Sequence, residues 1–555
     1  MLVTQLSYIH GASDVSLLGD TIGGYFDGVV EAYPDNEAVV SRHQGVRLTY
    51  RQLQAEVDRL ARALLALGVE KGDRVGIWSP NNVEWIIVQY ATAKVGAILV
   101  NINPAYRTHE LSYVLNQSGV SVLIATAGFR QANYAAMVQE VWSETPGLKQ
   151  VFIIGPEAPA KMETWDALLE RAGQVSGDDL KARGASLQFD DPINIQYTSG
   201  TTGFPKGATL SHHNILNNGY FVARRLRLSD KDRLCVPIPF YHCFGMVLGN
   251  LGFMTHGATV VIPGESFDAQ ACLETVQAER CTALYGVPTM FISILAHADF
   301  DQYDLSSLRT GAMGGSPCPV EVMRRVIDRM HMEEVTICYG MTETSPVSFQ
   351  SNTDDDLDRK VSTVGSIHPH VECKIVDPET GQTLPRGATG ELCSRGYLVM
   401  LYYWENPEAT HESIDEGRWM HTGDLAEMRE DGYVNIVGRI KDMIIRGGEN
   451  VYPREIEEFL YTHPQVADVQ VIGVPDIKYG EEVCAWVKLK DGEALSEDEV
   501  KDFCRGKIAT YKIPRYIRFT EQFPMTVTGK VQKFKMREVS VEELGLTQAA
   551  QVKTA

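Results

Sequence analysis

The sequence predicts an α/β protein with a large N-terminal domain of βαβ subdomains and a small β-rich subdomain, followed by a small α+β C-terminal domain. Short apolar runs alternate with helical patterns through the first part of the 555 residues, which is typical of parallel βαβ units. Around residues 365–440 the strand patterns become short and are punctuated by glycine. Beyond them, strand patterns and a charged helical pattern indicate a separate α+β domain.

The first long helix is expected to begin after Thr49. Thr49 and Gln52 have the spacing of a capping box, and Gly68 is suited to end the helix. Between them, apolar residues recur with the period of one helical face. These residues are Leu53, Val57, Leu60, Leu64 and Leu67.

Further elements are expected where apolar runs recur. In the N-terminal part we expect a helix over 83–94 and strands over 74–78, 97–102, 120–125, 233–237, 258–263 and 283–287. Glycine-bounded strands are expected over 372–377 and 391–394. The C-terminal part should hold strands over 468–474 and 482–489 and a helix over 496–505, with Val500 and Phe503 inward. Residues 438–442 mark the expected boundary, so the predicted domains are 1–440 and 441–555.

Charge and cysteine content exclude several classes of protein. The net charge of −21 disfavours binding to nucleic acid or to an anionic membrane, because both require a basic surface. The ten cysteines include no CxxC pair, so no metal cluster is expected. No signal peptide or apolar run of membrane-spanning length is recognised. We therefore expect reduced thiols and a cytoplasmic location.

A loop rich in hydrogen-bond donors lies at residues 197–207, which read YTSGTTGFPKG. Its Ser and Thr hydroxyls, glycine backbone N–H groups and Lys206 suit a polyphosphate. It follows an apolar run over 193–197 and lacks the GxxxxGK[ST] pattern of a Walker A loop. The competing interpretation is a flexible surface loop, which would rarely combine so many donors with a lysine.

A second stretch, residues 339–344, reads YGMTET. Tyr339 is suited to stack on a base, Thr342 to bind a phosphate and Glu343 to hold Mg²⁺. The competing interpretation is that Thr342 and Glu343 simply begin a helix, where a glutamate is favoured by the helix dipole.

Together the two stretches resemble the adenylate-forming superfamily of acyl-CoA synthetases, peptide-synthetase adenylation domains and luciferases. Four further motifs of that family follow in the expected order: HTGD at 421–424, GRIKD at 438–442, RGGEN at 446–450 and PMTVTGK at 524–530. The resemblance implies an enzyme that uses ATP and Mg²⁺ to convert a carboxylic acid to an acyl-adenylate. It also implies a mobile C-terminal domain that turns to let coenzyme A receive the acyl group.

The resemblance also implies roles for individual residues. Lys530, Thr342 and Glu343 would act in adenylation, with Glu343 as the Mg²⁺ ligand, and Lys441 would be the hinge. The residues expected to contact ATP or coenzyme A are Thr198, Ser199, Gly200, Thr201, Thr202, Gly203, Lys206, Gly314, Gly315, Tyr339, Asp424, Arg439, Gly447, Gly448 and Glu449. Taken singly, Asp424 could be a turn residue, Arg439 part of a structural ion pair and Lys530 a solvated lysine.

The acid-binding pocket is expected from the segment around His242, which would act at or gate the pocket; a packed core histidine is the equal alternative. The other expected lining residues are Phe240, Met246, Val287, Ala312, Met313 and Gly340. These small or apolar residues favour an apolar acid. Some long-chain members carry a tryptophan near the position of Met246, so a medium-chain fatty acid leads over a long-chain, branched or aromatic one.

The same residues leave other functions to consider. An enzyme that loads a carrier protein is the alternative to a coenzyme A ligase, and a luciferase-like side reaction stays open. A nucleotide-binding regulator without catalysis is disfavoured by the intact Lys530, Glu343 and Asp424. His411 and Asp415 have the HxxxD spacing of an acyltransferase but lack its other features. The resemblance allows a homodimer and names no interface.

Overall fold

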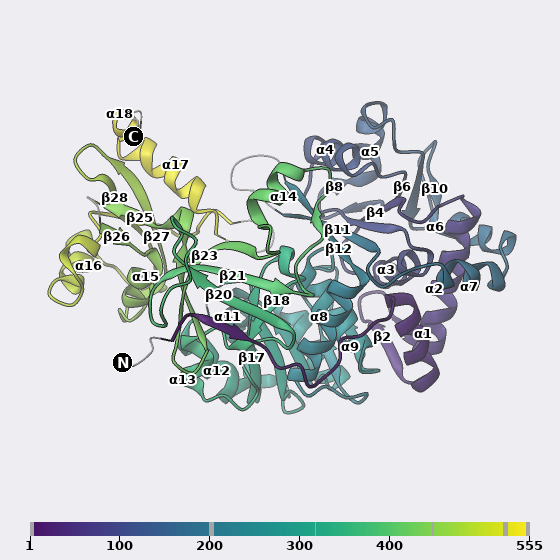
Figure 1. The fold of residues 1–555 in the computed structure, drawn as a ribbon, viewed down its shortest axis with the longest axis horizontal. Helices are drawn as coiled ribbons and strands as arrows, with labels where there is room; N and C mark the ends of the chain where they lie inside the picture. Colours follow the sequence, from purple (N-terminus) through teal and green to yellow (C-terminus); the bar gives the residue numbers. More distant parts are fainter. Residues whose placement is uncertain (1–4, 199–204, 317, 447–448, 526–530, 551–555) are drawn as a thin grey trace. The chain divides into compact units, whose positions relative to one another are not determined.

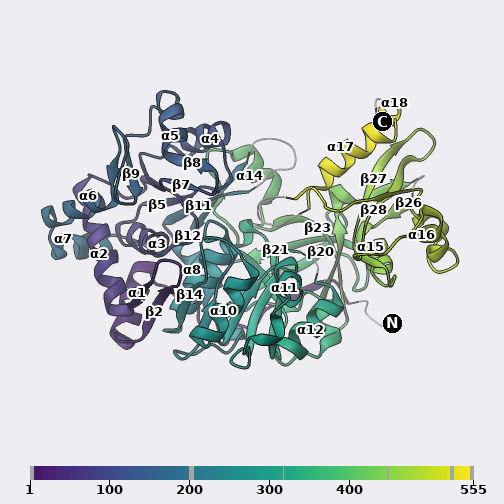
Figure 2. The ribbon, with the colours of Figure 1, turned by 180° about the vertical axis from the view of Figure 1, so that it is seen from behind.

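The computed structural model describes residues 5–198, 205–316, 318–446, 449–525 and 531–550, of which residues 449, 450 and 550 are described by their backbone alone. Contacts divide the chain into two units. Unit 1 comprises Met1–Tyr8, Lys374–Cys393 and His421–Ala555, and unit 2 comprises Ile9–Cys373 and Ser394–Met420. Figures 1 and 2 show the chain from opposite sides.

The first sheet of unit 2 has eight strands, in the order β10-β9-β6-β4-β5-β11-β12-β22. β4 pairs in parallel with both β5 and β6, so the centre of the sheet is parallel. Towards the β22 edge, β12 pairs antiparallel with both β11 and β22. The apolar central strands are buried, as expected of parallel strands covered by helices. The bounds are β4 Arg74–Trp78, β5 Ile98–Asn101, β6 Val122–Thr126, β9 Gln150–Ile154, β10 Glu163–Thr164, β11 Pro192–Thr198, β12 Lys206–Ser211 and β22 Tyr402–Tyr403.

The second sheet of unit 2 has nine strands, in the order β19-β18-β17-β16-β15-β13-β14-β2-β3. It is parallel from β17 to β2 and antiparallel at both edges. The bounds are β2 Glu37–Ser41, β3 Val46–Thr49, β13 Arg233–Cys235, β14 Thr259–Ile262, β15 Ala283–Gly286, β16 Thr310–Gly314, β17 Glu334–Gly340, β18 Val347–Gln350 and β19 Ser366–Ile367.

Helices of unit 2 connect these strands, as the alternating sequence pattern predicted. The helix expected after Thr49 is α2, with the capping box between Thr49 and Gln52 in place. The main helices are α1 Ile22–Ala32, α2 Tyr50–Ala66, α3 Val83–Val95, α4 Thr108–Ser118, α5 Tyr134–Val141, α6 Trp165–Glu170, α7 Gly177–Ala185, α8 His212–Arg225, α9 Gly252–Met254, α10 Ala269–Glu279, α11 Pro288–Leu295, α12 Val320–Met330, α13 Leu357–Ser362 and α14 Pro407–Ser413.

Unit 1 holds most of a five-stranded sheet, in the order β1-β20-β21-β23-β24, and a second sheet, β26-β25-β28-β27, with β29 paired to β28. The strands are β1 Tyr8–His10, β20 Val371–Val376, β21 Gly390–Gly396, β23 Met420–Met428, β24 Val434–Arg439, β25 Ile444–Arg446, β26 Glu449–Val451, β27 Val466–Asp476, β28 Gly480–Leu489 and β29 Tyr516–Phe519. The helices are α15 Pro453–Tyr461, α16 Glu497–Cys504, α17 Lys533–Glu543 and α18 Thr547–Ala550.

The predicted helix and strand positions agree with these bounds to within a few residues, and the α/β class with a separate C-terminal α+β part is confirmed. Val500 on α16 is buried and Phe503 packs against the same core. The division at residues 440 and 441 stays a prediction. Among the described residues, no helix is long and apolar enough to span a membrane.

Candidate functional site

The donor-rich loop is carried by an antiparallel hairpin. β11 ends at Thr198, β12 begins at Lys206, and these two residues pair across the hairpin. The Thr198 hydroxyl donates to the Lys206 carbonyl at 3.4 Å. The predicted phosphate-binding residues Ser199, Gly200, Thr201, Thr202 and Gly203 lie outside the described residues. Both ends of the loop are thus held by one sheet.

Lys206 and Glu343 both contact Tyr403, a residue that the sequence did not single out. β22 pairs with β12, which places the Lys206 ammonium 5.2 Å from the centroid of the Tyr403 ring. The Tyr403 hydroxyl donates to Glu343 Oε1 at 2.6 Å. Tyr403 is 5% exposed and Glu343 6% exposed. A cation from the loop and a buried carboxylate therefore share one aromatic side chain.

The environment of Tyr403 keeps its hydroxyl a hydrogen-bond donor. Burial, followed by the neighbouring Glu343 charge, raises the pKa of the Tyr403 phenol far above its usual range. The Met400 N–H also donates to the Glu343 carbonyl at 2.9 Å, which fixes the backbone of that residue. A carboxylate held this way is the type of hard oxygen ligand that Mg²⁺ prefers, so the residues present fit the predicted metal.

Tyr339 and three glycines line the carboxyl ends of adjacent parallel strands, where open α/β sheets bind ligands. A Cβ on Gly314 would lie 2.8 Å from the Cys338 carbonyl oxygen, and a Cβ on Gly340 would lie 1.7 Å from that of Pro346. Gly315 has φ +84°, which also favours glycine. Tyr339 is half-buried at the end of β17. These positions are compatible with the predicted contacts to adenine, which stay predictions.

His242 lies two residues before a π-helical segment, Phe244–Leu251, that the sequence did not predict. Such segments are rare and are frequent at functional sites. His242 Nδ1 accepts from the Phe244 N–H at 3.2 Å. The Cys243 thiol lies 3.7 Å from His242 Nδ1 and 3.7 Å from the Thr342 hydroxyl. The structure therefore brings the predicted residues His242 and Thr342 to one thiol.

A layer of buried amides surrounds Met246, which is 1% exposed. Its sulfur accepts from Asn101 Nδ2 at 3.5 Å and from Gln196 Nε2 at 3.8 Å. Asn194 Nδ2 in turn donates to Asn101 Oδ1 at 3.0 Å. Sequence reasoning missed this layer, although amides inside the apolar runs of β5 and β11 were a visible signal. Polar groups thus contact one of the residues predicted to line the acid pocket.

The other predicted lining residues differ in accessibility. Val287 lies beside Gly315, where a Cβ would be 3.3 Å from Val287 Cγ1. In contrast, Phe240, Ala312 and Met313 are fully buried. Burial is compatible both with the wall of a closed pocket and with the ordinary core, so their assignment to the pocket stays a prediction.

Asp424 and Arg439 pair across β23 and β24. Arg439 Nε donates to Asp424 Oδ1 at 3.0 Å, which is the ion pair that the sequence offered as the structural alternative. Lys441 is exposed in the 3₁₀ turn Ile440–Asp442. Gly447, Gly448 and Lys530 lie outside the described residues, and so does the side chain of Glu449.

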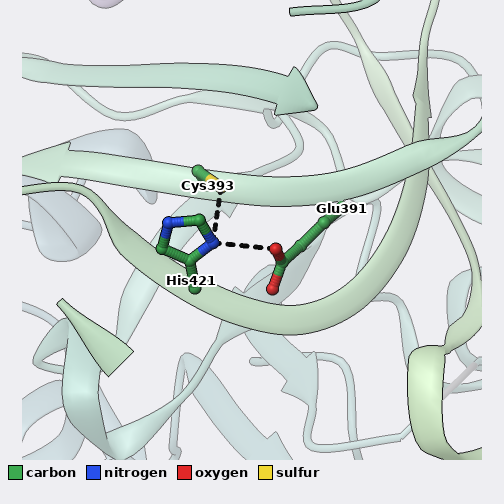
Figure 3. Close-up of side chains that lie close together, drawn as sticks. All are labelled: Glu391, Cys393 and His421. Atoms are coloured by element: carbon green, nitrogen blue, oxygen red, sulfur yellow. Dashed lines mark hydrogen bonds and ion pairs between the residues drawn. The ribbon is translucent and has the colours of Figure 1, made fainter. Parts of the chain in front are cut away.

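The part of β23 that leads to Asp424 is held by contacts among Glu391, Cys393 and His421 (Figure 3). Glu391 Oε2 lies 2.8 Å from His421 Nδ1, and Glu391 Oε1 accepts from the Gly423 N–H at 3.1 Å. Hydrogen bonds with Cys393 and then Glu391 raise the pKa of His421 to about 10. Because burial raises the pKa of the Cys393 thiol, the thiol is neutral near pH 7, and Glu391 supplies the charge that retains the His421 proton.

Comparisons with known proteins agree with these features. Residues 26–404 match the AMP-binding enzyme family, and residues 455–530 match the AMP-binding enzyme C-terminal domain. The putative acyl-CoA synthetase YngI of Bacillus subtilis is 50% identical over 96% of this chain and 99% of its own length. The human mitochondrial medium-chain acyl-CoA ligase ACSF2 is 43% identical over 98% of this chain and 91% of its own length.

Solved structures are similar over nearly the whole chain. The anthranilate CoA ligase AuaEII in complex with anthranoyl-AMP has a TM-score of 0.86 at 28% identity, covering 96% of this chain and 99% of that one. ATP-bound MatB from Rhodopseudomonas palustris has a TM-score of 0.82 at 30% identity, covering 93% of this chain and 99% of its own. The family model matches more than half of the chain, and the sequence relatives match along nearly all of it. The chain therefore belongs to the AMP-binding enzyme family.

Proposed function

We propose that this enzyme is an ATP-dependent acid–CoA ligase that uses ATP, Mg²⁺ and coenzyme A. A carboxylate oxygen of the acid attacks the α-phosphorus of ATP, and pyrophosphate leaves. The coenzyme A thiol then attacks the acyl carbon, loses its proton and displaces AMP. The observation that carries the proposal is the arrangement of Lys206 and Glu343 around Tyr403, which provides a cation and a metal-binding carboxylate within unit 2.

The first step joins two anions, so positioning and positive charge must supply most of the catalysis. Lys206 would bind the β- and γ-phosphates together with Thr198 to Gly203. Mg²⁺ held by Glu343 would neutralise charge that develops on the phosphate oxygens. Lys530 would bridge the attacking carboxylate and the phosphate, while Thr342 would bind the α-phosphate.

The remaining nucleotide contacts follow from the motifs. Tyr339 would stack on adenine beside the backbone of Gly314 and Gly315. Asp424 would accept from the ribose hydroxyls, with Arg439 holding its carboxylate as it does in the ion pair. These roles stay proposals, and so does the turn about Lys441 that would replace Lys530 by the Gly447–Gly448 segment for thioester formation.

The proposed acid is a medium-chain fatty acid. Support comes from the apolar residues predicted around His242 and from relatives named medium-chain acyl-CoA ligase at 43–45% identity. A branched or aromatic acid is the second candidate, because the anthranilate ligase has a similar fold.

Two assays on the full chain test the proposal. Acid-dependent exchange of pyrophosphate into ATP reports adenylation, and ATP-dependent consumption of coenzyme A reports transfer. We expect both activities to peak with straight-chain acids of medium length. Exchange without consumption of coenzyme A would favour a carrier-protein loading enzyme, and ATP binding without exchange for any acid would favour a regulator.

The cytoplasmic location also stays a prediction. Relatives include a bacterial protein and ligases named mitochondrial, so the family does not specify one compartment.

A further inference from the structure

We propose that Glu391, Cys393 and His421 form a binding site for one thiophilic divalent cation, with Zn²⁺ as the best match. The site lies in unit 1 and shares no residue with the proposed Mg²⁺ site, whose ligand Glu343 belongs to unit 2. The cysteines contain no CxxC pair, so sequence spacing gave no sign of it. The proposal rests on side chains that only the sheet brings together.

Neighbouring strands place the three side chains on one face of a sheet. β21 and β23 are adjacent in the strand order. Residues 391 and 393 share a face of β21 because side chains alternate along a strand, and His421 approaches them from β23 (Figure 3). One potential ligand atom from each residue lies within 4.8 Å of the other two.

The spacing of the donor atoms suits a tetrahedral zinc ion. Cys393 Sγ lies 3.5 Å from His421 Nδ1, and Zn–S and Zn–N bonds of about 2.3 and 2.0 Å at a tetrahedral angle separate S and N by about 3.5 Å. Glu391 Oε2 lies 2.8 Å from the same nitrogen. It would have to move away from that nitrogen by about 0.5 Å to reach the O···N separation of two ligands in a tetrahedral zinc site. A thiolate, an imidazole and a carboxylate form a zinc-type donor set, whereas Mg²⁺ and Ca²⁺ favour oxygen ligands alone.

A second layer of hydrogen bonds already orients the proposed ligands. Glu391 Oε1 accepts from the Gly423 N–H, which leaves Oε2 directed at His421. The Thr422 hydroxyl donates to the Leu392 carbonyl at 2.7 Å and ties the two strands together. Metal sites depend on such outer contacts to fix ligand orientation.

The site has an entry side and a balanced exchange of protons. The His421 side chain is 30% exposed and that of Glu391 11% exposed, whereas Cys393 is fully buried. A cation would therefore enter beside His421, and water would supply the fourth ligand. On binding, the Cys393 thiol and His421 Nδ1 release their protons to solvent and the cation takes their place.

The test is a metal titration of the full-length protein after treatment with a chelator. Zn²⁺ would be titrated in competition with a chromophoric chelator, and Co²⁺ would be added separately to detect thiolate-to-cobalt charge-transfer absorption. The variants are Cys393→Ser and His421→Gln. The matched control is Cys318→Ser, because Cys318 is more exposed than the other cysteines in the described part of the chain.

We expect the wild type and the Cys318→Ser variant to bind one equivalent of Zn²⁺ and to show the cobalt–thiolate band. Cys393→Ser should lose the band, and both site variants should bind Zn²⁺ at least about tenfold more weakly, as expected on loss of a ligand. Absence of stoichiometric binding or of the band in the wild type would overturn the proposal whether or not the variants fold. Retention of the band in Cys393→Ser, or its loss in Cys318→Ser, would also overturn it.

Discussion

Tyr403→Phe removes the hydroxyl that binds Glu343 and keeps the ring that lies beneath Lys206. The phenol donates to Glu343 Oε1 at 2.6 Å, and both side chains are almost fully buried. A hydrogen bond to a charged group contributes about 1.5–3 kcal/mol, which corresponds to about a 10- to 150-fold change in an equilibrium constant. The carboxylate proposed to hold Mg²⁺ would lose a contact that fixes its orientation.

The assay is pyrophosphate exchange measured across a series of Mg²⁺ concentrations, alongside calorimetric titration of ATP with and without Mg²⁺. We expect the Mg²⁺ concentration for half-maximal exchange to rise by about one order of magnitude or more, in line with the lost hydrogen bond. Binding of ATP in the absence of Mg²⁺ should change little, because Lys206 and its aromatic neighbour remain.

The matched control is Tyr402→Phe, which removes a hydroxyl from the adjacent, 37% exposed residue of the same strand. It should leave the Mg²⁺ dependence unchanged. If Tyr403→Phe shows the Mg²⁺ dependence of the wild type, or if both variants lose activity equally, the assignment of Tyr403 as the residue that positions Glu343 is wrong.

The remaining predictions concern the backbone, an ion pair and the separation of the two steps. Gly340→Ala should destabilise the protein by about 1–3 kcal/mol in chemical denaturation, because its Cβ would lie 1.7 Å from a backbone oxygen. The control Gly28→Ala has open space around its Cβ and should not destabilise the protein. Equal effects of the two substitutions would contradict the close approach at Gly340. Burial raises the pKa of Asp232, but hydrogen bonds from Arg309 and other donors bring it below its usual range. The charged Asp232 therefore stabilises the fold above the pKa of the unfolded state, and this stabilisation is lost as pH falls through the pKa of the folded state. Asp232→Asn should cost about 1–3 kcal/mol of stability at pH 7 and progressively less below about pH 4. A loss of stability that is independent of pH would argue against the role of the charge. Lys530→Ala should reduce pyrophosphate exchange strongly and largely spare thioester formation from supplied acyl-adenylate, and equal losses would refute the use of Lys530 in one step only.

Local patterns accounted for individual helices and strands. The helix after Thr49 was predictable because its capping box and apolar face involve residues within a few positions of each other. The strand over 74–78 was predictable because a short apolar run has few alternatives between two helices. The family motifs were similarly visible, since each lies within one continuous stretch of sequence.

Other features depend on contacts between distant segments. Tyr403 reaches Glu343 across 60 residues of sequence, and the amide donors to Met246 lie on strands far from it in the chain. The π-helical segment Phe244–Leu251 also gave no periodic signal that separates it from an α-helix. Local composition does not show which of these distant residues meet.

The sequence by itself thus determined the α/β class, most strand and helix positions and the ordered motifs of an AMP-binding enzyme, because periodicity, capping and short motifs act over a few residues. Only the tertiary structure decided that Tyr403 joins Lys206 to Glu343 and that Glu391, Cys393 and His421 converge. The physical reason is strand pairing: hydrogen bonding between β12 and β22, and the adjacency of β21 and β23, set which distant side chains meet.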